Sequence, residues 1–287
     1  MKLPIEDKVL EAIRMVWYAT IYNFQPFLNT KATNLTNGLL WTTKVFNKLK
    51  KQKRIQKIGL YPFFGRMYRY NQFYEVNRMK HDKWDTFDRN PIFSLASSLA
   101  MHQSGVRDIL IGFIFLYPDY EVVIKIEPIF NFDYKKYCEK NPDVDEKKVG
   151  WTYRPDAWVK LISKDNKKEY DFIIEFERTK RPMDIKMNKL EKIECLNLKE
   201  CGLSHFTKFL IFFTYQQYNA YWRPIEYDEP EVKKEIEAVE NRLNQLLTYA
   251  KEYPEPRYRF IPFHDFYRLN EAVWYTPEGK KVQLINL

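Results

Sequence analysis

The sequence of 287 residues has little cysteine and glycine and no long apolar run. Its three cysteines (Cys138, Cys195 and Cys201) are too few, and odd in number, for a disulfide framework, which favours a reducing compartment. The longest apolar stretch, 109–117, has nine residues, whereas a membrane-spanning helix needs about 20. The N-terminal residues lack the basic segment followed by an apolar run that is typical of a signal peptide. We therefore expect a soluble, cytoplasmic protein without a membrane partner.

The eight glycines also limit the chemistry that the chain can support. None forms a phosphate-binding GxxxxGK[ST] or GxGxxG loop, so nothing favours nucleotide hydrolysis or a dinucleotide cofactor. No GxSxG marks a serine hydrolase of that kind. The four histidines are dispersed, which argues against a relaxase with paired histidines. Cys195, Cys201 and His205 are irregularly spaced for zinc, and buried thiols are the simpler interpretation.

Positive charge is in excess, and the excess is confined to the first third of the chain. Residues 1–90 contain 17 Lys and Arg against 7 Asp and Glu, a balance of +10. The rest of the chain contains 30 against 31, a balance of −1. A basic domain beside a neutral one favours a polyanionic partner, because Lys and Arg contacts with phosphates release condensed counter-ions. The alternative is that these residues only keep a small domain soluble.

The basic region has the pattern of a winged helix-turn-helix, which we assign to residues 1–75. Apolar spacing predicts three helices followed by a two-stranded hairpin, over 5–18, 20–28, 34–51, 54–58 and 66–70. In such a domain the third helix enters the major groove of double-stranded DNA and the wing approaches the backbone. The side chains expected to bind DNA are Lys44, Lys48, Lys51, Arg54, Arg66 and Arg69. The alternative is a helical bundle whose lysines are only solvated.

Residues 76–91 are polar and are predicted to connect this domain to a second one over 92–287. The second domain mixes strands and helices, so its class is α/β or α+β. The predicted helices cover 94–103, 184–200 and 231–252, and the predicted strands cover 109–116, 121–126, 157–162, 170–177, 206–213 and 258–261. The apolar run 109–116 also fits a continuation of the preceding helix. The apolar stripe of 231–252 either packs on its own domain or forms a homodimer.

Carboxylates gather where two of these strands meet. Asp156 precedes the strand 157–162, and Glu175 and Glu177 end the strand 170–177. Because alternate residues share one face of a strand, a single face is expected to carry Asp171, Ile173, Glu175 and Glu177. Carboxylate oxygens bind Mg²⁺ or Mn²⁺, which can activate water and stabilise charge on a scissile phosphate. Asp156 and Glu175 are therefore the expected metal ligands.

The order of these residues resembles two known protein groups. Pro155-Asp156, a hairpin and then Glu175-x-Glu177 resemble the PD-(D/E)xK nuclease superfamily. A narrower resemblance, to the replication-relaxation family, rests on Arg154-Pro-Asp-Ala157, Ile174-Glu-Phe-Glu-Arg-Thr179 and Lys189-Leu190. Further segments follow in that family's order, namely the helix 95–102, the strand 209–214 and Val273-Trp274.

The narrower resemblance implies a winged helix joined to a restriction-endonuclease-like mixed-sheet domain. Proteins of this family are associated with plasmids and other mobile elements. The implied function is binding of double-stranded DNA in replication initiation or relaxation, with metal-dependent DNA cleavage as an additional activity. The implied partners are DNA, a second copy of the chain, and other replication or mobile-element proteins.

One departure from the superfamily pattern leaves the activity open. Glu177 stands where the superfamily has the lysine that orients the attacking water, although Lys189 or Lys180 offers an amine from another position. As an enzyme, the protein would use Asp156 and Glu175 as metal ligands, Glu177 as a further ligand or base, and Lys189 to stabilise charge. Alternatively, the site does not cut, and the protein is a DNA-binding regulator whose second domain serves assembly or dimerisation.

Two further interpretations compete with these. Glu175 and Glu177 could simply form a solvated strand face with basic neighbours. An RNA-binding module is a third functional class, which is disfavoured because the aromatic residues form no recognisable stacking motif.

Overall fold

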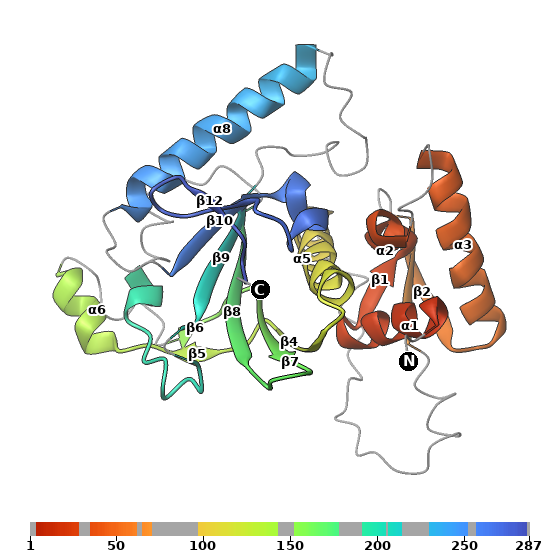
Figure 1. Ribbon diagram of the computed structural model, residues 1–287, viewed down its shortest axis with the longest axis horizontal. Coiled ribbons are helices and arrows are strands. Elements are labelled where there is room, and N and C mark those ends of the chain that lie inside the picture. Colours follow the sequence, from red (N-terminus) through yellow and green to blue (C-terminus); the bar gives the residue numbers. More distant parts are fainter. Residues whose placement is uncertain are drawn as a thin grey trace. The chain divides into compact units, whose positions relative to one another are not determined.

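The computed structural model describes residues 4–28, 35–61, 65–70, 97–142, 152–177, 191–204, 206–213, 230–251 and 257–285. The chain divides into two compact units, Met1–Phe115 and Leu116–Leu287 (Figure 1). The predicted connection over 76–91 lies outside the described residues. The described part of the chain is a mixed α/β structure with a small sheet in the first unit and a seven-stranded sheet in the second.

The first unit begins with helices and strands close to the predicted positions. They are α1 (Ile5–Met15), β1 (Tyr18–Thr20), α2 (Ile21–Leu28), α3 (Leu35–Lys51), β2 (Ile55–Tyr61) and β3 (Gly65–Tyr70). The sheet has the order β1-β3-β2, and both pairings are antiparallel. The hairpin β2–β3 matches the expectation, whereas β1 was not predicted: it lies where the predicted first helix (5–18) ends and the second (20–28) begins. The helix ends earlier because Trp17 adopts a left-handed backbone conformation with φ of 69°.

Helices α1 and α3 bury the apolar stripes that their sequences predict. Val9, Leu10 and Ile13 are buried on α1, whereas Val45, Phe46 and Leu49 are buried on α3. Phe24 of α2 meets Phe46 edge to face, with ring centroids 5.6 Å apart. This arrangement of aromatic rings adds to the stabilisation that comes from burying their area.

The apolar run 109–116 forms the second half of one helix, α5 (Ser97–Leu116), and not a strand. A short apolar run without alternation fits a buried strand and a buried helix equally well, so the sequence pattern left both open. The part of α5 up to Phe115 belongs to the first unit. Phe115 itself packs against Phe24 and Phe27 of α2, at centroid distances of 5.9 and 5.6 Å.

A buried hydrogen-bond network centred on Asn23 also ties α2 to α5. The Asn23 side-chain oxygen accepts bonds from the backbone nitrogen and hydroxyl of Thr20, at 2.6 and 3.0 Å. Its amide nitrogen donates to the Ser104 hydroxyl at 3.3 Å and to Asp108 Oδ1 at 2.7 Å. These four bonds use the full capacity of the Asn23 amide, which is only 1% exposed. Burial raises the pKa of Asp108 to about 7, although the bond from Asn23 opposes the shift.

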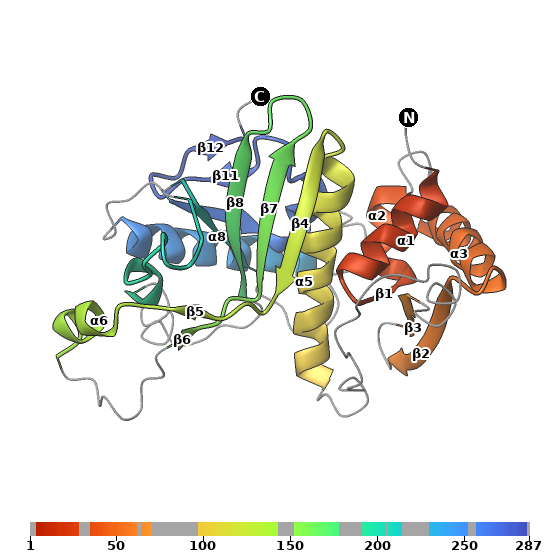
Figure 2. The same cartoon turned by 90° about the horizontal axis from the view of Figure 1, so that it is seen from below.

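The second unit is built on a mixed sheet with the order β12-β11-β10-β9-β8-β7-β4. Its strands are β4 (Tyr120–Ile126), β7 (Ala157–Ser163), β8 (Glu169–Glu177), β9 (Lys208–Phe213), β10 (Tyr258–Pro262), β11 (Trp274–Tyr275) and β12 (Lys281–Val282). Strands β4, β7 and β8 pair antiparallel with one another and lie side by side in Figure 2. Strands β8, β9 and β10 are parallel, and β11 and β12 continue the sheet antiparallel.

Shorter elements and one long helix complete the second unit. They are β5 (Phe130–Asn131), α6 (Tyr134–Lys140), β6 (Thr152–Tyr153), α8 (Pro230–Ala250) and the 3-10 helix η2 (Phe263–Arg268). On α8, Leu243, Leu246 and Ala250 join the core cluster that contains Phe209 and Phe260 of the sheet. This part of the α8 stripe therefore packs on its own unit, and the side chains of 230–236 lie outside the described residues.

Both faces of β8 are buried. Phe176 packs against Phe263 of η2 with ring centroids 4.7 Å apart, whereas Ile173 lies in the cluster covered by α8. Because residues of a strand alternate between its faces, Glu175 and Glu177 lie on the same side as Ile173. The carboxylates of Glu175 and Glu177 consequently face the interior of the second unit.

Candidate functional site

The β7–β8 hairpin places Asp156 beside Glu175. Ala157 pairs with Ile174, so the residue before Ala157 lies opposite the residue after Ile174. The Asp156 backbone nitrogen donates to the Ile174 carbonyl at 3.1 Å, and the Phe176 backbone nitrogen donates to Asp156 Oδ2 at 2.6 Å. The Asp156 side chain thus takes a backbone hydrogen bond on β8 and is fixed next to Glu175.

Three carboxylates of β8 are buried, whereas Glu169 at the start of the strand is exposed. Glu175 is 2% exposed, Asp171 is 3% exposed and Glu177 is 9% exposed. The interpretation that Glu175 and Glu177 form a solvated strand face is therefore wrong. Burial of carboxylates is costly unless hydrogen bonds or opposite charges compensate for the lost hydration. The compensating groups come from two elements that the sequence pattern did not connect with this site.

The first compensating group is the phenol of Tyr153 on β6. Its hydroxyl donates a hydrogen bond to Glu175 Oε1. Burial raises the pKa of Tyr153 well above its usual value, and the negative charge of Glu175 raises it further. Tyr153 therefore stays protonated and acts as a donor to the carboxylate. The only sequence signal for this contact is that Tyr153 lies three residues before Asp156.

The second compensating group is the guanidinium of Arg242 on α8. Arg242 is 4% exposed, and its Nη2 lies 3.9 Å from Glu177 Oε2. Burial lowers the pKa of Arg242, and the Glu177 charge opposes that shift. A positive charge thus lies beside Glu177, the residue at which the sequence departs from the PD-(D/E)xK pattern that it resembles. No local pattern predicts this pair, since its members are far apart in the sequence.

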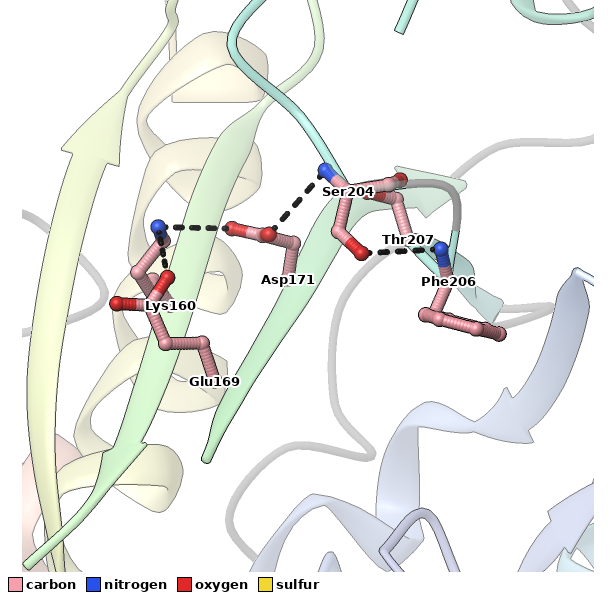
Figure 3. Close-up of polar contacts among 6 residues, drawn as sticks. All are labelled: Lys160, Glu169, Asp171, Ser204, Phe206 and Thr207. Carbon is pink, nitrogen blue, oxygen red and sulfur yellow. Dashed lines mark hydrogen bonds and ion pairs between the residues drawn. The ribbon is translucent and has the colours of Figure 1, made fainter. Parts of the chain in front are cut away.

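Asp171 shares the face of Glu175 but belongs to a different polar cluster (Figure 3). Its carboxylate lies 3.9 Å from the amine of Lys160 and accepts a 3.4 Å bond from the backbone nitrogen of Ser204. Lys160 also pairs with Glu169 at 2.7 Å. Burial raises the pKa of Asp171, and the charge of Lys160 opposes this shift. Asp171 is four residues from Glu175, about 13 Å along the strand, so it takes no part in the Asp156–Glu175 pair.

The remaining predicted residue of this site, Lys189, lies outside the described residues, as does Lys180. Among the described residues, no three His, Cys, Asp or Glu side chains are grouped closely enough to hold a metal ion. Mg²⁺ commonly keeps several of its waters and binds through only one or two carboxylates. Asp156 and Glu175, which lie opposite each other in the hairpin register, therefore offer carboxylates of suitable chemistry for Mg²⁺ or Mn²⁺, whereas two ligands would not complete a structural zinc site.

In the first unit, the basic residues of α3 lie on its solvent side. Lys44, Lys48 and Lys51 are exposed, whereas Val45 and Leu49 face the core. From Leu35 to Lys57 the chain has seven Lys and Arg and no Asp or Glu. This stretch therefore presents a positive surface, although part of its charge is neutralised by residues from elsewhere.

Two of the predicted DNA-binding residues form ion pairs with α1. Lys48 Nζ lies 2.6 Å from Glu6 Oε1, and Arg54 Nη1 lies 2.7 Å from Asp7 Oδ1. The bond from Lys48 lowers the pKa of Glu6. The Lys48–Glu6 pair is exposed and the Arg54–Asp7 pair is partly buried. Pairs at the protein surface contribute about 1 kcal/mol or less, so a stronger anion can displace them.

The two wing residues are placed only by their backbones. Arg66 pairs with Leu60 across the β2–β3 hairpin, and Arg69 lies between Gln56 and Tyr18 in the three-stranded sheet. Their side chains lie outside the described residues. The hairpin itself is close to the predicted wing.

No family model matches the chain, and neither a curated protein nor a solved structure matches it. The resemblance to the replication-relaxation family therefore rests on the quoted motifs alone. In the part of the chain that the structure describes, no helix is both long and apolar enough to cross a membrane.

Proposed function

We propose that this chain is a double-stranded DNA-binding protein with a nuclease-like second unit, related to the replication-relaxation proteins of plasmids and other mobile elements. In this proposal the first unit is a winged helix and α3 is its recognition helix. The second unit is a PD-(D/E)xK-like domain, whose partners are DNA and other replication or mobile-element proteins. The observation that carries the proposal is the position of Asp156 beside Glu175 at one end of a hairpin.

The DNA-binding half of the proposal is supported by the separation of charge. The +10 balance of residues 1–90 belongs to the sequence that contains α3, and the exposed lysines of α3 point away from its buried stripe. A helix fits into the major groove of B-DNA, where flanking lysines can reach phosphates. The positive surface of α3 thus supports DNA as the polyanion.

The cleavage half of the proposal is supported by the carboxylate pair and its hydrogen bonds. Asp156 and Glu175 would hold Mg²⁺ or Mn²⁺, which supplies an activated water and stabilises charge on the scissile phosphate. Tyr153 orients the Glu175 carboxylate, and the Phe176 nitrogen orients that of Asp156. Arg242 compensates the charge of Glu177 in the same interior region. These contacts hold the two proposed ligands in fixed positions, as a metal site requires.

A second candidate function is a DNA-binding regulator that does not cut. It is favoured by the pairing of Glu177 with the buried Arg242, since an engaged Glu177 is poorly placed to serve as a base. In that case, the second unit would serve assembly with a second copy of the chain or with other proteins. Both candidates predict duplex binding, and they differ only in metal-dependent cleavage.

Incubation of supercoiled plasmid with the protein and Mg²⁺ or Mn²⁺ separates the two functions. We expect nicking by the unchanged protein and a loss of at least about a hundredfold in the Asp156→Ala variant, because a proposed metal ligand is removed. Asp165→Ala, which removes an exposed aspartate from the β7–β8 turn, should nick at the unchanged rate. Intact DNA binding without nicking under either metal would contradict the enzyme and leave the regulator.

The ion pairs with α1 predict a gain of affinity on substitution. Glu6→Gln combined with Asp7→Asn should strengthen duplex binding about five- to tenfold at low salt. The double change frees Lys48 and Arg54 for phosphates and removes two negative charges near them. Fluorescence anisotropy with a labelled duplex measures the change, with Glu11→Gln on the same helix as the matched control. Unchanged or weaker binding would show that Lys48 and Arg54 do not face DNA.

A further inference from the structure

An exposed tryptophan lies on the basic face of α3. Trp41 is 40% exposed and precedes Lys44, Lys48 and Lys51 at spacings of three, four and three residues. Residues at these spacings share one side of a helix. The same side therefore carries one large aromatic ring and three ammonium groups, and it flanks the buried stripe that contains Leu49.

This position distinguishes Trp41 from the other exposed apolar residues. Among the described side chains, the large exposed apolar ones are Trp17, Trp41, Ile129, Phe206 and Tyr267. Only Trp41 lies within the stretch from Leu35 to Lys57, which has seven basic residues and no acidic one. A ring held among positive charges is complementary to a ligand that combines negative charge with apolar groups. Duplex DNA, with its phosphates and the methyl groups of its thymines, is such a ligand.

We propose that Trp41 contacts thymine methyl groups in the major groove and gives the protein a preference for thymine-containing duplexes. The inference rests on the proposed binding of α3 to DNA and adds a specificity residue to it. Thymine C5-methyl is the apolar group of the major groove, and apolar side chains recognise it by direct contact. The lysines of the same face bind phosphates, which position the helix without reading sequence.

The dimensions of α3 agree with this division of roles. From Trp41 to Lys51 the helix rises by about 15 Å, at 1.5 Å per residue. Trp41 is in the N-terminal half of α3, and the N-terminal residues of a recognition helix contact base edges. Lys44 follows one turn later and Lys51 ends the helix, where it can reach the backbone of the duplex.

A cycle that changes both the protein and the DNA tests the contact. The probe is a labelled AT-rich duplex of about 30 base pairs, compared with the same duplex in which every thymine is replaced by uracil. The unchanged protein should bind the uracil duplex roughly fivefold more weakly. Trp41→Ala should lose about tenfold on the thymine duplex and show no further loss on the uracil duplex, because the contact with the methyl groups is already gone.

Matched variants keep this test interpretable. Trp17→Ala removes an equally exposed tryptophan outside α3 and should retain the full difference between the two duplexes. If Trp41→Ala does not fold, as judged by circular dichroism, Trp41→Gln replaces it. A full uracil penalty in the Trp41 variant would overturn the thymine contact while leaving DNA binding in place. Failure of the unchanged protein to bind either duplex would overturn the proposed DNA-binding function together with this inference.

Discussion

Reversing the charges of Lys44, Lys48 and Lys51 to glutamate is expected to lower duplex affinity about a thousandfold at 50 mM salt. All three side chains are exposed on one side of α3. Each lost phosphate contact and each new repulsion costs roughly 0.5–1 kcal/mol, and six such terms amount to about 4 kcal/mol. Lys48→Glu also places a carboxylate next to Glu6, which adds to the negative potential of the surface.

Salt dependence provides the sharper measurement for this triple variant. The logarithm of the binding constant falls with the logarithm of salt concentration in proportion to the number of phosphates contacted. Removing three contacts should therefore reduce the slope by about 3. The matched control reverses three exposed lysines of the second unit (Lys135, Lys140 and Lys199), which changes net charge equally. An unchanged slope in the α3 variant would contradict the assignment of this face to DNA.

The elements that were predicted well are those fixed by contacts close in the sequence. The β7–β8 hairpin follows from alternation on either side of a short polar turn, and that hairpin alone brings Asp156 next to Glu175. Helix α3 was predicted from a single apolar stripe, and that stripe is buried in the structure. Local pattern was sufficient in these cases because the partners are neighbours along the chain.

The contacts that were missed depend on residues far apart in the sequence. Arg242 reaches Glu177 from α8, and Glu6 reaches Lys48 from α1, so neither pair leaves a local pattern. The second half of α5 was ambiguous because its apolar residues show neither alternation nor a polar side. Only the tertiary packing of α5 against α2 decides between helix and strand there, and this packing includes an ionisable group that no periodicity reveals.

That group is Asp108, and its burial predicts a strong pH dependence of stability. The folded-state pKa is raised to about 7, against 3.8 for an aspartate in water. Between these values the folded protein holds a proton that the unfolded chain has lost. Stability should therefore fall as pH rises from about 4 to about 7, and the loss is complete above the folded-state pKa. Three pKa units correspond to about 4 kcal/mol, which is an upper figure for this single group.

Asp108→Asn should remove this dependence. The amide keeps an oxygen that accepts the bond from Asn23 Nδ2, and it carries no charge at any pH. The variant should resemble the unchanged protein at pH 4 and be more stable by up to a few kcal/mol at pH 8. Urea denaturation at the two pH values measures the difference in the free energy of unfolding. Asn23→Ala breaks the same hydrogen-bond network and should lower the stability at both pH values, which identifies the unfolding transition that contains α2 and α5.

The control for this prediction is Asp119→Asn, which changes an exposed aspartate outside the network and should leave the pH dependence as it was. If the free energy of unfolding changes with pH by the same amount in Asp108→Asn and in the unchanged protein, Asp108 is solvated in the folded state. If the curves instead converge at pH 4 and separate at pH 8, the network between α2 and α5 excludes water. Helix α5 would then be an integral part of the proposed DNA-binding unit, and the fragment 1–75 alone would expose its apolar contacts.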